Sequence, residues 1–375
     1  MPESYEIGTG KSARRGYRLS DVSIVPTRRT RSSHDVSIGW QIDAFPFELP
    51  MIGHPSDATM SPDTAIEVGQ LGGLGVLNAE GLWTRYDDPR ALFGQIADGL
   101  GGLPVAEDSA LLQELYSEPV KPELIGERIR TIRDAGVTVA VRLSPQSTVD
   151  LASVVLDAGV DLLVVQGTIV SAERVSQHGK PLNLKEFIAD LDVPVIVGGA
   201  ATYQTALHLM RTGAAGVIVG DGSSDVEFDD VLGIEAPMAS AISDAAAARR
   251  DYLDETGGRY VHVIADGEID NSASIAKAIA CGADAVAVGR PLSRAESAPG
   301  GGAWWRSAAA HPKLPRGFVW AQDAAPVGMS EILLGPTSYA DGTTNLFGAL
   351  ARTMAKTGFS DLKEFQRVGL ILRVD

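Results

Sequence analysis

The chain has 375 residues, 45% of them hydrophobic and 21% charged, so it is long enough to bury a large core, even as one domain. Its formal net charge of −16 at pH 7 argues against a broad surface for nucleic acid or for an anionic membrane, because both would repel it. With Cys281 as its single cysteine it can form no intrachain disulfide. We find no signal-peptide pattern and no apolar run of membrane-spanning length, and we expect a cytoplasmic protein.

Short apolar runs, separated by segments of helical periodicity, repeat along most of the chain. Residues 1–48 precede the repeat as a predicted N-terminal arm, whose basic stretch at 14–31 we expect to pair with the protein's own carboxylates or with a neighbouring subunit. Glycine follows several predicted helices, where it can take the left-handed cap conformation before a strand begins. The predicted strands are Leu49–Gly53, Gly73–Leu77, Val137–Leu143, Leu162–Val165, Val193–Val197, Gly216–Val219, Tyr260–Ala265 and Ala285–Val288.

Eight fully apolar strands that alternate with helices predict a (β/α)₈ TIM barrel, an α/β fold, as a single domain over residues 1–375. A doubly wound open sheet is the alternative, but no G-x-G-x-x-G pattern follows the first strand. Two segments depart from the repeat. Residues 84–120 are a predicted helical insertion, and residues 291–345 form a long lid-like or flap-like insertion after strand eight.

Active sites of such barrels lie at the carboxyl ends of the strands. Gly267 and Gly289 end two neighbouring strands, where backbone N–H groups can approach an anion, and Arg290 would add a charged donor; this predicts a phosphate site. Asp266 is placed to accept hydrogen bonds from a ribose diol, although a helix N-cap or an Asx turn would also use it. His54 is a candidate catalytic or structural imidazole. The strand ends carry no histidine and carboxylate cluster at metal-ligand spacing, so we expect no metal.

Three stretches follow one known pattern: VIADG at 263–267, AKAIACGADAV at 276–286 and GDGS at 220–223. With LSDVSIVP at 19–26 and the segment 345–365, they resemble the IMP dehydrogenase/GMP reductase family. The chain has no inserted paired-repeat regulatory (CBS) domain and is most similar to the CBS-less paralogues. The resemblance implies a purine nucleoside monophosphate as ligand, NAD or NADP as cofactor and a homotetramer. It also implies that Asp266 holds the ribose while Ser223, Gly267 and Gly289 surround the phosphate.

The chain departs from this family at several positions. The family's nucleophilic cysteine would fall near Val226, Glu227 and Phe228, in a loop that has no cysteine and is acidic. Glu268 stands where the family has the second glycine of Asp-Gly-Gly, and Gln166 where it has an aspartate. Three functions therefore stay open: an NAD(P)-linked purine-nucleotide oxidoreductase, a catalytically silent nucleotide-binding or regulatory paralogue, and an FMN-binding barrel, which Gly289-Arg290-Pro291 would suit.

Overall fold

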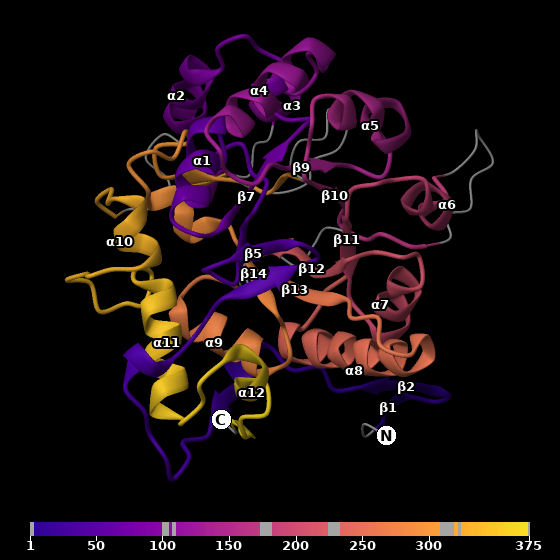
Figure 1. Cartoon of the computed structure of the whole chain (residues 1–375), viewed down its shortest axis with the longest axis vertical. Coiled ribbons are helices and arrows are strands. Elements are labelled where there is room, and N and C mark those ends of the chain that lie inside the picture. Colours follow the sequence, from indigo (N-terminus) through magenta and orange to yellow (C-terminus); the bar gives the residue numbers. More distant parts are fainter. Residues whose placement is uncertain are drawn as a thin grey trace.

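The computed structural model describes residues 4–99, 105–106, 110–172, 182–223, 233–307, 319–321 and 324–373. Eight parallel strands close into a barrel, in the chain order that the sequence predicts (Figure 1). The predicted TIM-barrel fold is therefore confirmed. The strands are β6 (Met51–Gly53), β7 (Leu74–Asn78), β9 (Ala140–Leu143), β10 (Leu162–Gln166), β11 (Val195–Ala200), β12 (Gly216–Ser223), β13 (His262–Gly267) and β14 (Ala285–Val288), and β14 pairs with β6 to complete the circle.

Helices surround the barrel, and local capping explains where several of them begin (Figure 1). Ser61 accepts a hydrogen bond from the Thr64 N–H and precedes a proline at the first helical position. The helices around the barrel are α1 (Pro62–Gln70), α4 (Pro122–Asp134), α5 (Thr148–Asp157), α6 (Leu184–Ala189), α7 (Tyr203–Met210), α8 (Met238–Thr256), α9 (Ser272–Ala280) and α11 (Leu346–Lys356).

Strand boundaries differ from the predicted ones for identifiable reasons. β11 begins at Val195 rather than Val193, and the intervening Pro194 has no N–H for a ladder. β9 begins at Ala140 rather than Val137, because the Val139 N–H is bound by the Asp161 carboxylate instead of a neighbouring strand. β12 runs on to Ser223, four residues beyond the predicted end, where Ser223 pairs with Gly267 of β13.

The segment predicted as an N-terminal arm closes the amino end of the barrel. A hairpin of β4 (Trp40–Ile42) and β5 (Phe45–Phe47) lies over the strands in Figure 1. Ile42 is fully buried and lies against Gly216, where an added Cβ would come within 3.3 Å of the Ile42 side chain. Further out are the hairpin of β1 (Ser4–Gly8) and β2 (Lys11–Arg14), the 3-10 turns η1 (Leu19–Asp21) and η2 (Ser33–Asp35), and β3 (Val22–Ile24), which pairs with β17 (Leu370–Leu372).

The two insertions predicted from the sequence meet in one small sheet. β8 (Val105–Ala106) from the first insertion pairs with β16 (Val319–Ala321) from the second, and β16 pairs with β15 (Ala303–Trp304). We call these three strands the cap sheet. The insertions also contain α2 (Arg90–Gly99), α3 (Ala110–Leu115) and α10 (Met329–Leu333). The 3-10 turns η3 (Leu82–Thr84) and η4 (Arg290–Arg294) lead into them, and α12 (Leu362–Phe365) lies near the C-terminus.

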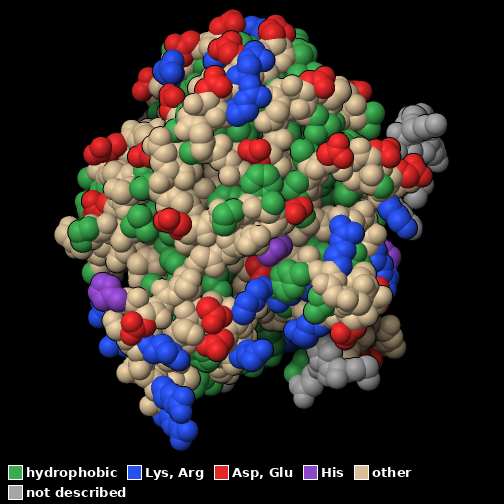
Figure 2. Space-filling view, in the orientation of Figure 1, with side chains coloured by type: hydrophobic (Ala, Val, Ile, Leu, Met, Phe, Trp, Pro, Cys, Tyr) green, Lys and Arg blue, Asp and Glu red, His purple; other side chains and the backbone are tan. Residues whose placement is uncertain are grey.

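The surface carries basic side chains scattered among acidic ones, as the negative net charge of the sequence suggests. Figure 2 shows Lys and Arg side chains in small groups between acidic ones, without a continuous basic area on this face. Two arginines of the predicted basic stretch pair with the protein's own carboxylates, Arg14 with Asp244 and Arg18 with Glu235. No helix within the described residues is long and apolar enough to cross a membrane.

Candidate functional site

Asp266 lies near the carboxyl end of β13 and is held on both carboxylate oxygens. The Nδ1 atom of His54 lies 3.1 Å from Oδ1, and the Gln166 side-chain amide donates to Oδ2 at 2.5 Å. All three residues are buried. The alternative role of Asp266 as a helix cap is wrong, because Asn271 caps α9 and accepts from the Ser274 N–H. Asp266 orients the imidazole through Nδ1. The other ring nitrogen of His54, Nε2, has no hydrogen-bond partner within the described residues and is available to a ligand.

Side-chain alternation places a polar layer inside the barrel next to Asp266. At the amino end the interior is apolar, since Gly216 faces the side chains of Ile196 and Ile264. Asp266 lies two residues beyond Ile264 and therefore points to the same interior face. Residues that pair in register on neighbouring strands point to the same face. Ile196 pairs with Val164, Val164 with Arg142, and Arg142 with Asn78, so these side chains also face the barrel interior. Gln166, two residues after Val164, belongs to the same face.

Arg142 is the charge at the centre of this layer. One terminal nitrogen donates to the Gln166 carbonyl at 2.7 Å, and the other lies 3.3 Å from both the Asn78 side-chain oxygen and Glu80. Burial lowers the pKa of Arg142. Burial raises the pKa of Glu80, but Arg142 and hydrogen bonds from Ser144 and Ser147 outweigh this, so the pKa is lowered overall. Arg142 and Glu80 thus form a buried ion pair.

A second buried carboxylate, Asp57, ties the loop after β6 to the insertions. One of its oxygens accepts from the Tyr116 hydroxyl and from the Leu82 N–H, while the other has no partner within the described residues. Burial raises the pKa of Asp57 to about 6, against the smaller opposing effect of Tyr116. The Trp305 indole N–H in turn donates to the Tyr116 oxygen at 3.0 Å. Asp57 and Tyr116 thereby connect the barrel to both insertions.

The residues predicted to hold a phosphate are brought together in part. Gly267 and Ser223 are direct register partners, whereas the Ser223 side chain is not among those described. Gly289 is covered by the cap sheet, since a Cβ there would lie 3.1 Å from the Trp304 indole nitrogen and 3.2 Å from the His54 Cβ. That nitrogen has no partner within the described residues. The Arg290 guanidinium lies 4.8 Å over the Trp320 ring and so faces the cap sheet.

Glu268 keeps the backbone conformation that glycine would have supplied. Its φ is +55°, in the left-handed region. The carboxylate accepts from the Leu19 N–H at 2.6 Å and from the Met238 N–H, the first residue of α8, at 3.3 Å. A negative side chain at a helix N-terminus is favourable. Glu268 thus joins the N-terminal segment to α8, a role that its sequence position alone did not indicate.

Two further predictions concern thiol and metal chemistry. Cys281 is the C-cap residue of α9, at the end of the barrel opposite the strand carboxyl ends, and burial raises its pKa to about 11. Val226, Glu227 and Phe228, where the family's cysteine would fall, lie outside the described residues. Within the described residues, no group of three or more His, Cys, Asp or Glu side chains could hold a metal ion.

Sequence reasoning assigned no role in the site to several polar residues of the barrel mouth: Asn78, Glu80, Arg142, Asp57, Tyr116 and Trp304. Arg142 left a recognisable signal, because it interrupts the apolar strand TVAVRL. A charged residue within a fully buried strand needs a partner. The sequence around Tyr116 and Trp304 gives no such signal, because these residues reach the site through contacts between segments far apart in the sequence.

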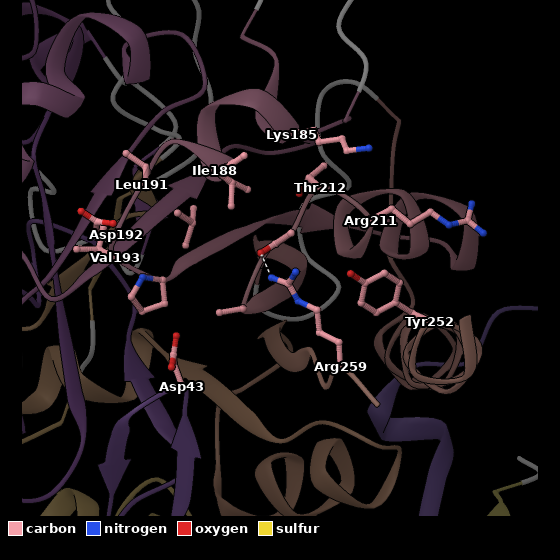
Figure 3. Close-up of a pocket in the computed structure, with 15 residues that line it drawn as sticks. Asp43, Lys185, Ile188, Leu191, Asp192, Val193, Arg211, Thr212, Tyr252 and Arg259 are labelled. Carbon is pink, nitrogen blue, oxygen red and sulfur yellow. Dashed lines mark hydrogen bonds between the residues drawn. The ribbon is translucent and has the colours of Figure 1, made fainter. Parts of the chain in front are cut away.

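A pocket of about 400 Å³ lies at the opposite end of the barrel, around the start of β11 (Figure 3). It contains cationic side chains, but Arg211 pairs with Glu255 and Arg259 donates to the Gly213 carbonyl. In Figure 3 Lys185 and Arg211 extend away from its centre. The arrangement therefore supports a ligand less well than the mouth, where several buried polar atoms have no partner within the described residues.

Comparison with known proteins places this site in a family. The model of the IMP dehydrogenase/GMP reductase domain matches residues 16–374. The chain belongs to this family. Its polar layer at the carboxyl ends of the strands is thus the mouth of an IMP dehydrogenase/GMP reductase barrel.

The chain is similar to proteins at several distances. A solved IMP dehydrogenase/GMP reductase-like protein from Corynebacterium glutamicum has a TM-score of 0.93 and 53% identity, covering 99% of this chain and 98% of that chain. An uncharacterized oxidoreductase of Mycobacterium leprae is 58% identical over 374 residues, covering 98% of this chain and all of the relative. Inosine-5'-monophosphate dehydrogenase of Aquifex aeolicus is 24% identical over 409 residues, covering 99% of this chain and 78% of the relative.

Proposed function

We propose that the protein binds a purine nucleoside monophosphate at the carboxyl end of its barrel and performs no thiolate chemistry on it. The observation that carries the proposal is the buried Asp266 carboxylate beside the Gly267 turn, at the position where the family resemblance puts the ribose. Each carboxylate oxygen has two lone pairs, so Asp266 can accept a ribose hydroxyl in addition to its bonds from His54 and Gln166. The Trp304 indole N–H lies next to Gly289, has no partner among the residues that the structure describes, and adds a donor for the phosphate.

The absence of thiolate chemistry follows from the position of the only cysteine. A thiol at the C-cap of α9 cannot reach a purine at the other end of the barrel, and its raised pKa keeps it protonated at neutral pH. Calorimetric titration with IMP, GMP and XMP tests the proposal. One of them should bind with one site per chain, with equal affinity in Cys281→Ala protein. No binding of any of the three would overturn it.

A second candidate function is an oxidoreductase that uses an imidazole base. The His54–Asp266 pair favours it, because the carboxylate fixes Nδ1 and leaves Nε2 to exchange a proton with a substrate. NAD or NADP would supply the hydride chemistry. FMN is the alternative cofactor, and a visible absorption spectrum of the purified protein distinguishes it. Turnover of NAD(P)H with a purine nucleotide, lost in His54→Asn, would establish this function instead.

The family also suggests a homotetramer, which we include in the proposal. The exposed β1–β2 hairpin and the exposed arginines near residue 30 are surfaces that a neighbouring subunit could cover. Light scattering after size-exclusion chromatography should give four times the chain mass of 39.4 kDa. A monomer at micromolar concentration would contradict the tetramer without affecting the nucleotide site.

A further inference from the structure

The pocket at the amino end of the barrel brings several separate segments to one cavity (Figure 3). Its volume of about 400 Å³ falls within the range of small-ligand pockets, roughly 300–1,000 Å³. Gly213 comes from the turn after α7, Tyr252 from the last turns of α8, and Asp43 from the turn between β4 and β5. Side chains far apart in the sequence therefore face a common space.

Tyr252 presents to this pocket a hydroxyl that no described protein group uses. Its side chain lines the pocket and is 5% exposed. Buried tyrosine hydroxyls usually find a hydrogen-bond partner, but none of the described residues bonds to this one. In Figure 3 the hydroxyl points toward the Arg259 guanidinium. A ligand atom that accepts from Arg259 can thus also meet the Tyr252 hydroxyl.

Arg259 reaches the same pocket because the chain reverses at the end of α8. Gly257 takes the left-handed cap conformation, with a φ of +68°, and the Gly258 N–H donates to the Leu253 carbonyl. One terminal nitrogen of Arg259 donates to the Gly213 carbonyl. Among the described residues no carboxylate pairs with this guanidinium, so its other N–H groups can bind an anionic group of a ligand.

Negative charge and apolar surface line the same cavity. Asp43 has no ion pair within the part of the chain that the structure describes, and its carboxylate is directed into the pocket in Figure 3. The C-terminal end of α7 adds partial negative charge. Ile188, Leu191 and Pro194 supply half-buried apolar wall. A bare anion such as phosphate would be repelled by Asp43, and a bare cation by Arg259.

We propose that this pocket binds a small amino acid zwitterion with an apolar side chain. The ligand carboxylate accepts from Arg259 and from the Tyr252 hydroxyl, and the ligand ammonium group pairs with Asp43. The apolar side chain packs against Ile188 and Pro194. Because the pocket lies at the end of the barrel opposite the proposed nucleotide site, this second site does not depend on nucleotide binding.

Calorimetry on the wild-type protein tests the class of ligand. L-leucine, L-valine, L-methionine and L-phenylalanine are the probes, and one of them should bind at one site per chain with a Kd of about 1 mM or tighter. Its truncated analogues are the controls. For L-leucine, 4-methylpentanoate lacks the ammonium group and 3-methylbutylamine lacks the carboxylate, and each should bind at least about tenfold more weakly. No saturable binding of any probe, or equal binding of a probe and both its analogues, would overturn the proposal.

Tyr252→Phe separates a ligand contact from a structural role. Because the hydroxyl bonds to no described residue, its removal should leave the midpoint of urea unfolding unchanged, yet it should weaken binding of the amino acid about tenfold. Arg259→Gln should weaken binding at least as much. Arg211→Gln is the matched control, because Arg211 pairs with Glu255 and extends away from the pocket centre, and it should leave the affinity unchanged.

Asp43→Asn tests the contact to the ammonium group. Asparagine tolerates the left-handed backbone at this position, where φ is +51°, so the turn should be preserved. The variant should lose the preference for the amino acid over its carboxylate analogue. An affinity that neither Tyr252→Phe nor Arg259→Gln changes would place the ligand elsewhere on the protein and overturn the proposal.

Discussion

Replacing Asp57 with asparagine should change the pH dependence of stability. The unfolding free energy of the variant, measured relative to that of the wild type, should be higher at neutral pH than in weak acid. The Asp57 carboxylate is buried against Gly81, where an added Cβ would lie 2.0 Å from one carboxylate oxygen. Among the described residues, only its other oxygen has hydrogen-bond partners. Burial raises its pKa from 3.8 to about 6. Asparagine removes the ionisation and retains one oxygen that can accept from both Tyr116 and Leu82.

The sign and size of the effect follow from proton linkage. A group whose pKa is higher in the folded state stabilises the fold fully below pH 3.8, and that contribution is lost as the pH rises through about 6. The whole loss corresponds to about 3 kcal/mol, of which about 1.4 kcal/mol falls between pH 5 and pH 7.5. The unfolding free energy of Asp57→Asn minus that of the wild type should therefore rise by about 1.4 kcal/mol across this interval.

Urea unfolding followed by tryptophan fluorescence at pH 5 and pH 7.5 measures this difference. Tyr116→Phe removes a hydrogen bond that favours the charged carboxylate and should move the transition to higher pH. Asp284→Asn is the matched control, because the pKa of Asp284 lies at about 2, so its difference from the wild type should stay constant between the two pH values. Parallel pH profiles for the wild type and Asp57→Asn would show that Asp57 is solvated or paired, and would refute the reasoning.

Four other outcomes can be measured on single variants or on the wild type. Asp284→Asn should lower stability at pH 7 by about 3 kcal/mol, since Arg249 and Lys363 lose a buried partner; an unchanged urea midpoint would contradict this. Cys281 should react slowly with iodoacetamide at pH 8, and Cys281→Ala should cost about 1 kcal/mol; fast alkylation of the native protein would disprove its burial. Trp305→Phe should weaken the join between the insertions by about 1 kcal/mol, with faster hydrogen exchange at residues 303–305, whereas identical exchange would show that its bond to Tyr116 is unimportant. Glu268→Gly should relieve the positive φ yet lose the hydrogen bonds from Leu19 and Met238, so stability should change by less than about 1 kcal/mol, and a larger loss would mean that the side-chain contacts of Glu268 dominate.

The barrel could be predicted because each strand is a short apolar run and several helices are followed by glycine, so local pattern and global fold agree. α9 (Ser272–Ala280) follows this pattern, because the Asn271 cap and the glycine after Cys281 delimit it. The predicted strand boundaries were wrong where a backbone N–H could not join the hydrogen bonds between strands. At Val139 a side chain takes the N–H, and Pro194 has none.

The site was predictable only where its residues end a strand. Asp266, Gly267 and Gly289 follow from position and from family resemblance. The interior partners of Asp266 do not, because pairing of His54 and Gln166 with it depends on barrel closure, which joins residues 100 to 212 positions apart. The packing of Trp304 over Gly289 depends on how the insertions fold onto the barrel, and no local pattern encodes that.

A crystal structure of the protein grown with IMP tests the central claim most directly. The account predicts one nucleotide per chain at the carboxyl end of the barrel, with a ribose hydroxyl on Asp266, the phosphate at the Gly267 and Gly289 turns, and no covalent bond between the purine and any side chain. Nucleotide density at the opposite end of the barrel, in the pocket near Arg259, or an empty mouth at saturating IMP, would contradict it.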